Sequence, residues 1–401
     1  MNAPTDTRPT LNSTLGFGRG ACALAVSLGV GRFVYTPILP LMQAQAGLSA
    51  RAGALVATAN YLGYFLGALL TMLAPQTFRS RTVLRACLVA LVVTSASMPL
   101  TPELGAWFLL RALSGLASAV VFVIAVNSLL TTSSATGEGW TFAGAGAGIA
   151  LSGLLVAWAP FGHTWTAAWW SAAALTAVLA AGAWSLRTGA APTANADPGV
   201  PRKRPRSARW FVALLVSYFM EGVGYIIAGT FLVAAVAQRT PGLVGVAWVL
   251  VGLTAIPACV LWAGLGRRWP RPILLPVALA LQALGVALPA LSSSGAAALV
   301  SAALFGGTFL AIGMIVMPIG TQLGGRRTVA VLTVAYGLGQ ILGPLLVTPL
   351  LDHGYGPALL VGSVIVAGGA GIAALLGIRH LRCTSAPAGG VPVPRVVREI
   401  A

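Results

Sequence analysis

The chain has 401 residues, of which 57% are hydrophobic and only 8% are charged. A soluble domain carries roughly 25% charged residues, so this composition excludes an ordinary globular protein. The formal net charge of +17 raises the question of nucleic-acid binding, which the placement of the charges along the chain argues against.

Apolar runs of about 20 residues are long enough to cross a bilayer core of about 30 Å as helices. Twelve such runs follow one another with short polar breaks between them. In the first half we expect spans at 15–44, 50–74, 82–99, 104–131, 136–160 and 164–186. In the second half we expect spans at 209–237, 242–265, 272–290, 295–323, 328–351 and 357–380. The chain is therefore predicted to be an all-α membrane protein with twelve transmembrane helices.

The first run contains the segment GVGRFVYTPILP at 29–40, which places an arginine and two prolines inside an apolar helix. A charge near the bilayer centre costs about 2.5–3.5 kcal/mol on insertion scales, so Arg32 is expected to face the interior of the bundle. Pro37 and Pro40 lie toward the outer end, where neighbouring groups can satisfy freed carbonyls and a bent helix can serve gating. Gly29 and Gly31 precede the arginine and belong to the same candidate gating segment.

Two further charges lie inside spans, Arg111 in the fourth run and Glu221 in the seventh. Helical spacing puts Tyr35 on the face of Arg32, and puts Tyr218 and Tyr225 on the face of Glu221. Two interpretations remain open. One is a structural salt bridge of Glu221 with Arg32 or Arg111; the other is a substrate or proton site, and the two overlap because making and breaking a pair can drive a conformational change.

Glycines spaced four residues apart allow helix backbones to approach closely in a membrane. The candidate gating and packing residues of this kind are Gly148, Gly339 and Gly343, and Gly115 of the fourth run and Pro344 of the eleventh are added to them. The alternating GAGAG at 144–148 is interpreted as helix packing rather than a nucleotide-binding loop, because no strand precedes it.

A polar, proline-rich and basic segment at 187–208 divides the spans six and six. The halves match at a shift of about 190 residues: GVG at 29–31 falls on GVG at 222–224, and GAGIALSGLLV at 146–156 falls on GLGQILGPLLV at 337–347. Parallel repeats of six spans are a transporter design with the substrate between the halves. The expected organisation is a tail at 1–14, bundles at 15–186 and 209–380 joined by the linker at 187–208, and a tail at 381–401.

Of the 24 Lys and Arg residues, 20 fall on the side of the N-terminus, two on the opposite side and two inside spans. This asymmetry follows the positive-inside rule, so both termini are expected to be cytoplasmic and the protein to lie in the plasma (inner) membrane. The four cysteines and three histidines form no cluster, and no phosphate-binding G-x-x-x-x-G-K-[ST] motif occurs. We therefore expect no metal, no cofactor, no nucleic-acid partner and no enzymatic activity.

The segments GVGRFVYTPILPLM, RALSGLASAVVFV, EGVGYIIAGTFLVA and YGLGQILGP resemble the major facilitator superfamily, and within it the YbfB-like branch. The resemblance covers essentially the whole membrane chain. It implies two pseudo-symmetric six-helix bundles whose first, fourth, seventh and tenth helices line a central cavity. It also implies a role in proton coupling for Arg111.

The leading hypothesis is a proton-coupled secondary transporter that moves a small, anionic organic solute by alternating access. Two arginines against one glutamate favour an anion, with Glu221 as the proton carrier. Asn60 and Gln340 are further candidates for hydrogen bonds to substrate. The expected partners are the substrate, protons and the lipid bilayer, and the expected state is a monomer. The alternatives are proton-driven efflux of amphipathic or cationic compounds and a membrane scaffold or sensor without transport.

Overall fold

The computed structural model describes residues 11–74, 76–77, 80–130, 135–157, 164–186, 208–324 and 326–385. Apart from Ala208, the predicted linker lies outside these residues, as do most of the two predicted tails. The described ends of the chain are helical: the first helix already begins at Leu11 and the last continues to Ser385. The first and last described helices therefore extend into both predicted tails.

The first half consists of seven α-helices and one π-helix, η1, because its first span is interrupted. Their bounds are α1 Leu11–Leu24, η1 Ala25–Arg32, α2 Tyr35–Gln45, α3 Ala50–Leu73, α4 Arg81–Ser97, α5 Leu104–Leu130, α6 Ala135–Ala157 and α7 Trp165–Ala183. Short 3-10 helices lie between the longer ones: Met98–Leu100 follows α4, Pro241–Leu243 precedes the helix that begins at Val244, and Thr348–His353, labelled η5, follows the helix that ends at Val347.

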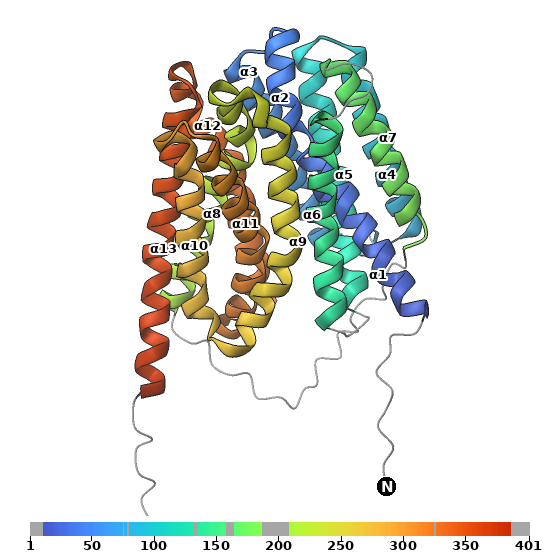
Figure 1. The fold of residues 1–401 in the computed structure, drawn as a ribbon. Helices are drawn as coiled ribbons and strands as arrows, with labels where there is room; N and C mark the ends of the chain where they lie inside the picture. The colour runs from blue at the N-terminus through green and yellow to red at the C-terminus, as the bar shows by residue number, and fades with distance from the viewer. Residues whose placement is uncertain are drawn as a thin grey trace, which may run out of the picture.

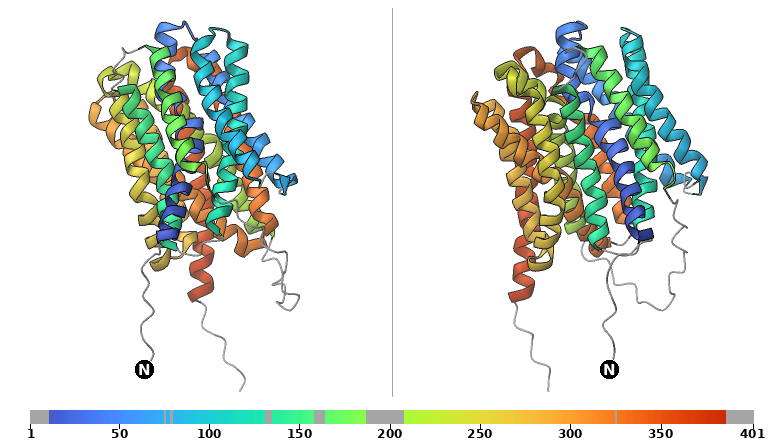
Figure 2. Two further views of the ribbon diagram at one scale, coloured as in Figure 1. Left: turned by 90° about the vertical axis from the view of Figure 1, so that its right-hand side faces the viewer. Right: turned by 45° about the vertical axis from the view of Figure 1, so that its right-hand side comes forward.

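Among the described residues, the second half contains the long helices α8 to α13, which follow one another in the order of the six spans of the first half. Their bounds are α8 Ala208–Arg239, α9 Val244–Arg268, α10 Arg271–Leu291, α11 Gly295–Gly324, α12 Arg326–Val347 and α13 Tyr355–Ser385. Figure 1 shows the two halves side by side, and the further views in Figure 2 show helices that run roughly along one common axis.

The twelve predicted runs each correspond to one helical stretch among the described residues. Eleven of these stretches are long and apolar enough to cross a bilayer, the first being the composite Gly16–Gln45, while α6 contributes the shorter apolar stretch Thr141–Ala157. Serine or threonine caps the start of four of the described helices: Ser49, Ser80, Thr164 and Ser294 each accept a hydrogen bond from the backbone N–H three residues on. Such caps satisfy the unpaired N–H groups of a first turn where the chain leaves a loop.

The helix contacts repeat between the halves, as expected of a duplicated design. In the first half α3 packs on α5 and α6 on η1; in the second half α9 packs on α11 and α12 on α8. Across the halves α6 packs on α9, and its counterpart α12 packs on α3. These contacts describe the predicted fold class, with twelve transmembrane helices in two pseudo-symmetric bundles.

The predicted packing glycines lie where helix backbones meet. A Cβ on Gly115 would overlap the Asn60 carbonyl, joining α5 to α3, and one on Gly148 would lie 2.5 Å from the Ala25 oxygen, joining α6 to η1. Gly339 and Gly343 bring α12 against α8 in the same way. Replacing these residues would therefore separate helices that position the buried charges.

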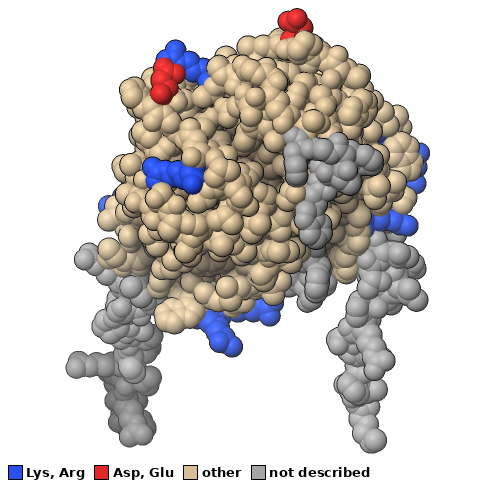
Figure 3. Space-filling view, turned by 45° about the horizontal axis from the view of Figure 1, so that its top comes forward, with Lys and Arg blue, Asp and Glu red and all other residues tan. Residues whose placement is uncertain are grey.

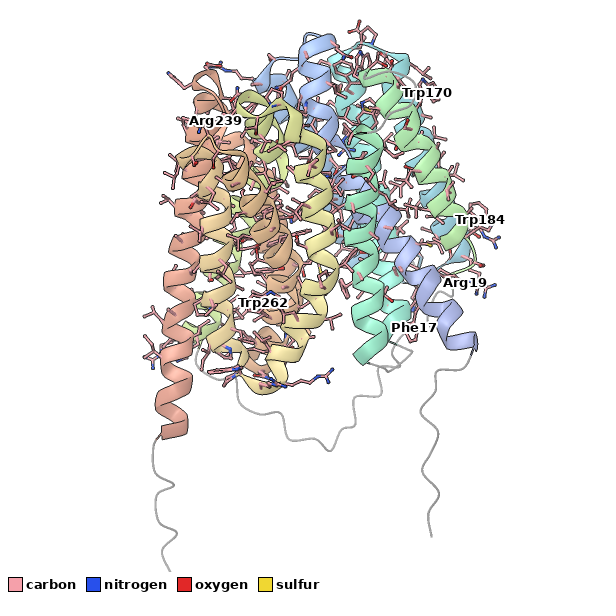
Figure 4. All side chains as sticks on the ribbon, in the orientation of Figure 1. Phe17, Arg19, Trp170, Trp184, Arg239 and Trp262 are labelled. Carbon is pink, nitrogen blue, oxygen red and sulfur yellow. The ribbon has the colours of Figure 1, made fainter. Side chains whose placement is uncertain are left out.

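Most of the outer surface is apolar. Exposed leucines and valines lie along nearly every helix, and Figure 3 shows charged side chains only sparsely on the tan surface. The described arginines at helix ends fall mainly on the side of Arg19, while Arg51 and Arg239 lie on the opposite side, as Figure 4 shows for Arg19 and Arg239. We refer to these two ends of the molecule as the Arg19 end and the Arg239 end.

Candidate functional site

The first span is broken at its centre. The π-helix η1 ends at Arg32, a turn occupies Phe33 and Val34, and α2 begins at Tyr35. Proline has no N–H to continue a helical ladder, so Pro37 disfavours regular hydrogen bonding just before it. The backbone N–H of Thr36 donates to the Phe33 carbonyl, three residues earlier, at 3.2 Å, instead of forming the bond to the fourth residue back that an α-helix requires. The break therefore precedes both predicted prolines, and Pro40 lies inside α2.

Arg111 on α5 occupies the break. Its Nη1 donates to the Gly31 carbonyl at 3.1 Å and its Nη2 to the Arg32 carbonyl at 2.8 Å. Two more side chains donate to the Gly31 carbonyl, Ser114 at 2.9 Å and Asn60 at 3.3 Å. Asn60 also binds the Arg111 carbonyl at 3.0 Å. The guanidinium of Arg111 thus holds together the backbone from which Arg32 projects, and the Tyr35 ring lies 5.3 Å from it.

This arrangement predicts that Arg111→Gln destabilises the protein. The Arg32 carbonyl loses its charged donor while the Gly31 carbonyl keeps Ser114 and Asn60, and leaving one such buried group unsatisfied costs about 1–3 kcal/mol. Thermal unfolding of the purified protein measures the loss, with the surface substitution Arg85→Gln on α4 as the matched control. An Arg111→Gln variant that unfolds at the temperature of the control would contradict the capping role.

Arg32 itself is 4% exposed and has only neutral partners among the described residues. Its Nη2 donates to Gln340 Oε1 at 2.6 Å and to Tyr225 Oη at 3.2 Å, and Gln340 Nε2 donates to the same Tyr225 oxygen at 2.8 Å. Its guanidinium carbon lies 4.3 Å from the centre of the Tyr64 ring and 5.4 Å from that of Tyr61. Cations are attracted to such ring faces, which partly offsets the loss of water.

Tyrosines concentrate around this arginine. The chain has seven tyrosines, and five of them lie close enough to act electrostatically on Arg32 or to feel its charge. These five are Tyr61, Tyr64, Tyr218, Tyr225 and Tyr336. Tyr218 stacks on Tyr336 at 4.4 Å between ring centres, and Tyr336 stacks on Tyr225 at 5.4 Å.

Two contacts place this region on the pseudo-twofold axis. Arg32 contacts Tyr225, and Thr36 donates to the Gly229 carbonyl at 2.6 Å; both pairs are 193 residues apart. That separation equals the shift that aligns GVG at 29–31 with GVG at 222–224. Each residue therefore touches its own counterpart in the other half, which happens only on the axis that relates the halves.

The ion pairs considered for Glu221 are not formed. Glu221 is fully buried, and neither carboxyl oxygen has a hydrogen-bond partner among the described residues. Gln282 of α10, also fully buried and without a partner among them, lies beside the carboxyl together with Tyr336. Glu221 lies one helical turn before Tyr225, the residue that meets Arg32, so its carboxyl belongs to the interior of the second half. The salt bridge that the sequence left open, Glu221 with Arg32 or Arg111, is not formed among the described residues.

Sequence reasoning missed two residues of the site, Gln282 and Tyr336. Gln282 is a single amide in the otherwise apolar run at 272–290, and a polar residue inside a span is a general signal of function. Tyr336 lies one helical turn before Gln340 on α12, so spacing from the candidate Gln340 would have found it. Among the described residues, no three His, Cys, Asp or Glu side chains gather in a way that could hold a metal ion.

The hydrogen bonds that join the halves extend from Arg32 toward the Arg239 end. They include Tyr61 with Thr230 at 2.8 Å, Trp248 with Ser152 at 3.2 Å, and Gln43 with Tyr355. The described part of the chain shows one salt bridge between the halves, Arg51 with Asp352. Toward the Arg19 end, Figure 1 shows α1 sloping away from the second half. These hydrogen bonds and the salt bridge between the two halves thus lie between Arg32 and the Arg239 end.

Comparison with known proteins gives a consistent picture of the fold. The profile of a family described as "Uncharacterised MFS-type transporter YbfB" matches residues 24–377. A point mutant of the nucleoside transporter NupG superposes with a TM-score of 0.65 at 14% identity, covering 92% of this chain and 99% of that one. NupG itself gives 0.62 at 13% identity, covering 93% and 98%. A comparison with curated proteins gives no match.

Proposed function

Since the chain belongs to the family of YbfB-type transporters of the major facilitator superfamily, we propose that it is a proton-coupled transporter of a small organic anion. The chain is a secondary transporter with a multi-pass membrane fold. The finer proposal concerns the substrate's charge, the coupling ion and the direction in which the site opens.

The single observation that carries the anion proposal is the buried charge of Arg32. The guanidinium is 4% exposed, and its described hydrogen-bond partners are a phenol and an amide. Taking a charge out of water costs several kcal/mol unless an opposite charge is nearby. An anionic substrate would supply that opposite charge on the axis between the halves. Glu221 lies in the interior of the second half, one turn from Tyr225, rather than on the axis between the halves, which disfavours the alternative in which this carboxylate meets a cationic compound directly.

Glu221 is the proposed proton carrier. A buried carboxyl without a cation beside it is costly to ionise, and neither oxygen of Glu221 forms a hydrogen bond among the described residues, although Gln282 and Tyr336 lie beside it. Tyr336 lies beside this carboxyl and stacks on Tyr225, which binds Arg32. Movement of the tyrosines when an anion binds Arg32 would therefore change the surroundings of Glu221, and this is the proposed link between substrate and proton.

The position of the contacts between the halves indicates which end of the transporter is closed in this conformation. The contacts between the halves support a conformation that is closed at the Arg239 end. With the excess of basic residues at the Arg19 end placed in the cytoplasm, this conformation would face inward, in a plasma (inner) membrane with both termini cytoplasmic. Opening toward the outside would then require breaking the contacts from Thr36–Gly229 to Arg51–Asp352.

The proposal is tested in proteoliposomes that contain a trapped pH-sensitive dye. Adding a transported carboxylate should move protons across the membrane together with the substrate, and a protonophore should prevent its accumulation. Accumulation that ignores the pH gradient would contradict proton coupling. Uptake confined to cationic or neutral solutes would contradict an anionic substrate.

A further inference from the structure

In this conformation the guanidinium of Arg32 is hydrogen-bonded to an amide of the protein itself. Gln340 of α12 is 1% exposed, and its Oε1 accepts a hydrogen bond from Arg32 Nη2 at 2.6 Å. Arginine has only N–H donors, so the amide must turn its oxygen toward Arg32 and its NH₂ group away from it. That group, Gln340 Nε2, donates to Tyr225 Oη at 2.8 Å. The planar amide therefore bridges a charged group of the first half and a phenol of the second.

The repeat indicates that helix packing does not require this amide. The alignment of GAGIALSGLLV with GLGQILGPLLV pairs Gln340 with Ile149 and Pro344 with Gly153. Ile149 is also 1% exposed, so an apolar side chain fills the equivalent buried position of α6. At these aligned positions the amide and the proline belong to the second half, and the arginine that the amide contacts belongs to the first.

Pro344 weakens α12 at the level of Gln340. Proline has no N–H, so the carbonyl four residues earlier, which is that of Gln340, receives no α-helical hydrogen bond from it. Pro344 lies inside α12, which continues past it to Val347. Sharp bends of helices occur at such prolines. A bend of α12 at this point would draw the side chain of Gln340 away from Arg32.

Resting on the proposed transport of an anion, we infer that Gln340 holds the place of a substrate carboxylate, which displaces its amide from Arg32 and Tyr225. A carboxylate is planar and of the same size as the amide, so it needs only the space that the amide vacates. One oxygen replaces Oε1 of Gln340 on Arg32, and the other replaces Nε2 and accepts the hydroxyl proton of Tyr225. The exchange favours the carboxylate, because a hydrogen bond between two ionised groups is stronger than one to a neutral acceptor.

The binding test uses acetate and the variant Gln340→Ala. This substitution removes Cγ, Cδ, Oε1 and Nε2, and acetate has the same arrangement of heavy atoms with oxygen in place of nitrogen. Titration of the purified full chain is followed by saturation-transfer NMR at the methyl group of the ligand. Acetate should bind Gln340→Ala at least about tenfold more tightly than the wild-type protein, because no internal hydrogen bond to the arginine must be broken. The matched control Gln322→Ala, at an exposed glutamine near the end of α11, should bind acetate as the wild-type protein does.

Two further ligands define the chemical class with the same variant, Gln340→Ala. Acetamide has the shape of acetate without its charge and should bind at least about tenfold more weakly. Methanesulfonate has the charge on a tetrahedral group and should also bind more weakly than acetate, because the vacated space is that of a planar group. Adding Arg32→Gln to Gln340→Ala should abolish acetate binding.

A second measurement needs no ligand. Gln340→Glu supplies a carboxylate to Arg32 permanently, so it should raise the unfolding temperature by at least about 2 °C and abolish acetate binding. In the presence of Arg32→Gln the same substitution should lower the unfolding temperature, because the carboxylate is then buried without a cation. Gln322→Glu is the matched control and should leave the unfolding temperature unchanged in both backgrounds.

Weaker binding of acetate by Gln340→Ala than by the wild-type protein would overturn the inference, because Gln340 would then be a direct contact of the ligand. A lower unfolding temperature of Gln340→Glu with Arg32 present would overturn it as well. Methanesulfonate binding as tightly as acetate would overturn the carboxylate but leave an anion standing, and acetamide binding as tightly would contradict both. Failure of acetate to bind any variant would overturn the inference, and proton-linked uptake in proteoliposomes would then decide the proposed function separately.

Discussion

Replacing Glu221 by glutamine will abolish substrate accumulation driven by a pH gradient while exchange of substrate across the membrane continues. Glutamine keeps the size and polarity of the side chain but cannot take up or release a proton. Glu221 is fully buried, and its oxygens are without hydrogen-bond partners among the described residues, so the neutral amide suits the position and the fold should persist. Exchange needs no net proton movement, which is why the two activities should separate.

The measurement compares accumulation and exchange of labelled substrate in the same proteoliposomes over a range of pH. Glu103→Gln is the matched control, because Glu103 is an exposed carboxylate just before α5. The control should behave as the wild-type protein in both assays. If Glu221→Gln retains gradient-driven accumulation with the wild-type dependence on pH, Glu221 is not the proton carrier.

Replacing Arg32 by glutamine will remove high-affinity substrate binding. Loss of one partner of a buried, hydrogen-bonded charge pair costs about 2–5 kcal/mol, or at least about 30-fold in Kd. Arg32→Lys should recover only part of the affinity, because lysine keeps the charge but lacks the planar pair of N–H groups. Equilibrium binding to the purified variants measures both effects.

Stability distinguishes this binding role from a structural one. Arg32 has no carboxylate partner among the described residues, so removing its charge takes away an uncompensated cost of burial. Arg32→Gln should therefore unfold at a temperature no lower than that of Arg209→Gln, a control at the exposed start of α8. Retained affinity, or lost affinity accompanied by a large fall in unfolding temperature, would assign Arg32 a bracing role. Arg111→Gln is expected to show that second pattern.

The helices were predictable because the bilayer imposes a length on every span. The predicted spans 50–74 and 295–323 agree closely with α3 at Ala50–Leu73 and α11 at Gly295–Gly324. The π-helix was not predictable from hydropathy, since an apolar run has the same composition whether its backbone hydrogen bonds span four residues or five. The prolines indicated an irregular helix, but its break depends on Arg111, which lies 79 residues away from Arg32 in the chain.

The sequence indicated several residues of the candidate site, but it did not indicate which of them contact one another. Arg32, Tyr225 and Gln340 do come together, whereas Glu221 lies apart with Gln282 and Tyr336. The sequence left a salt bridge of Glu221 with Arg32 or Arg111 open, because these are the charges inside the predicted spans. The repeat aligns Arg32 with Tyr225, and that counterpart is the contact it makes. Charge complementarity alone therefore did not identify the partner of Arg32.

The contact of Arg32 with its own counterpart limits how the two halves could have diverged. In an ancestor assembled from two identical copies, position 32 would have faced a second arginine across the axis, and two buried like charges in contact repel strongly. Such a protein could keep the charge in only one copy. Here the other copy carries Tyr225, a neutral group that accepts a hydrogen bond from the charged one. With an arginine from one half and a tyrosine from the other, the axis between the halves has a charged side and an aromatic side, so a substrate that binds there meets different groups from the two halves.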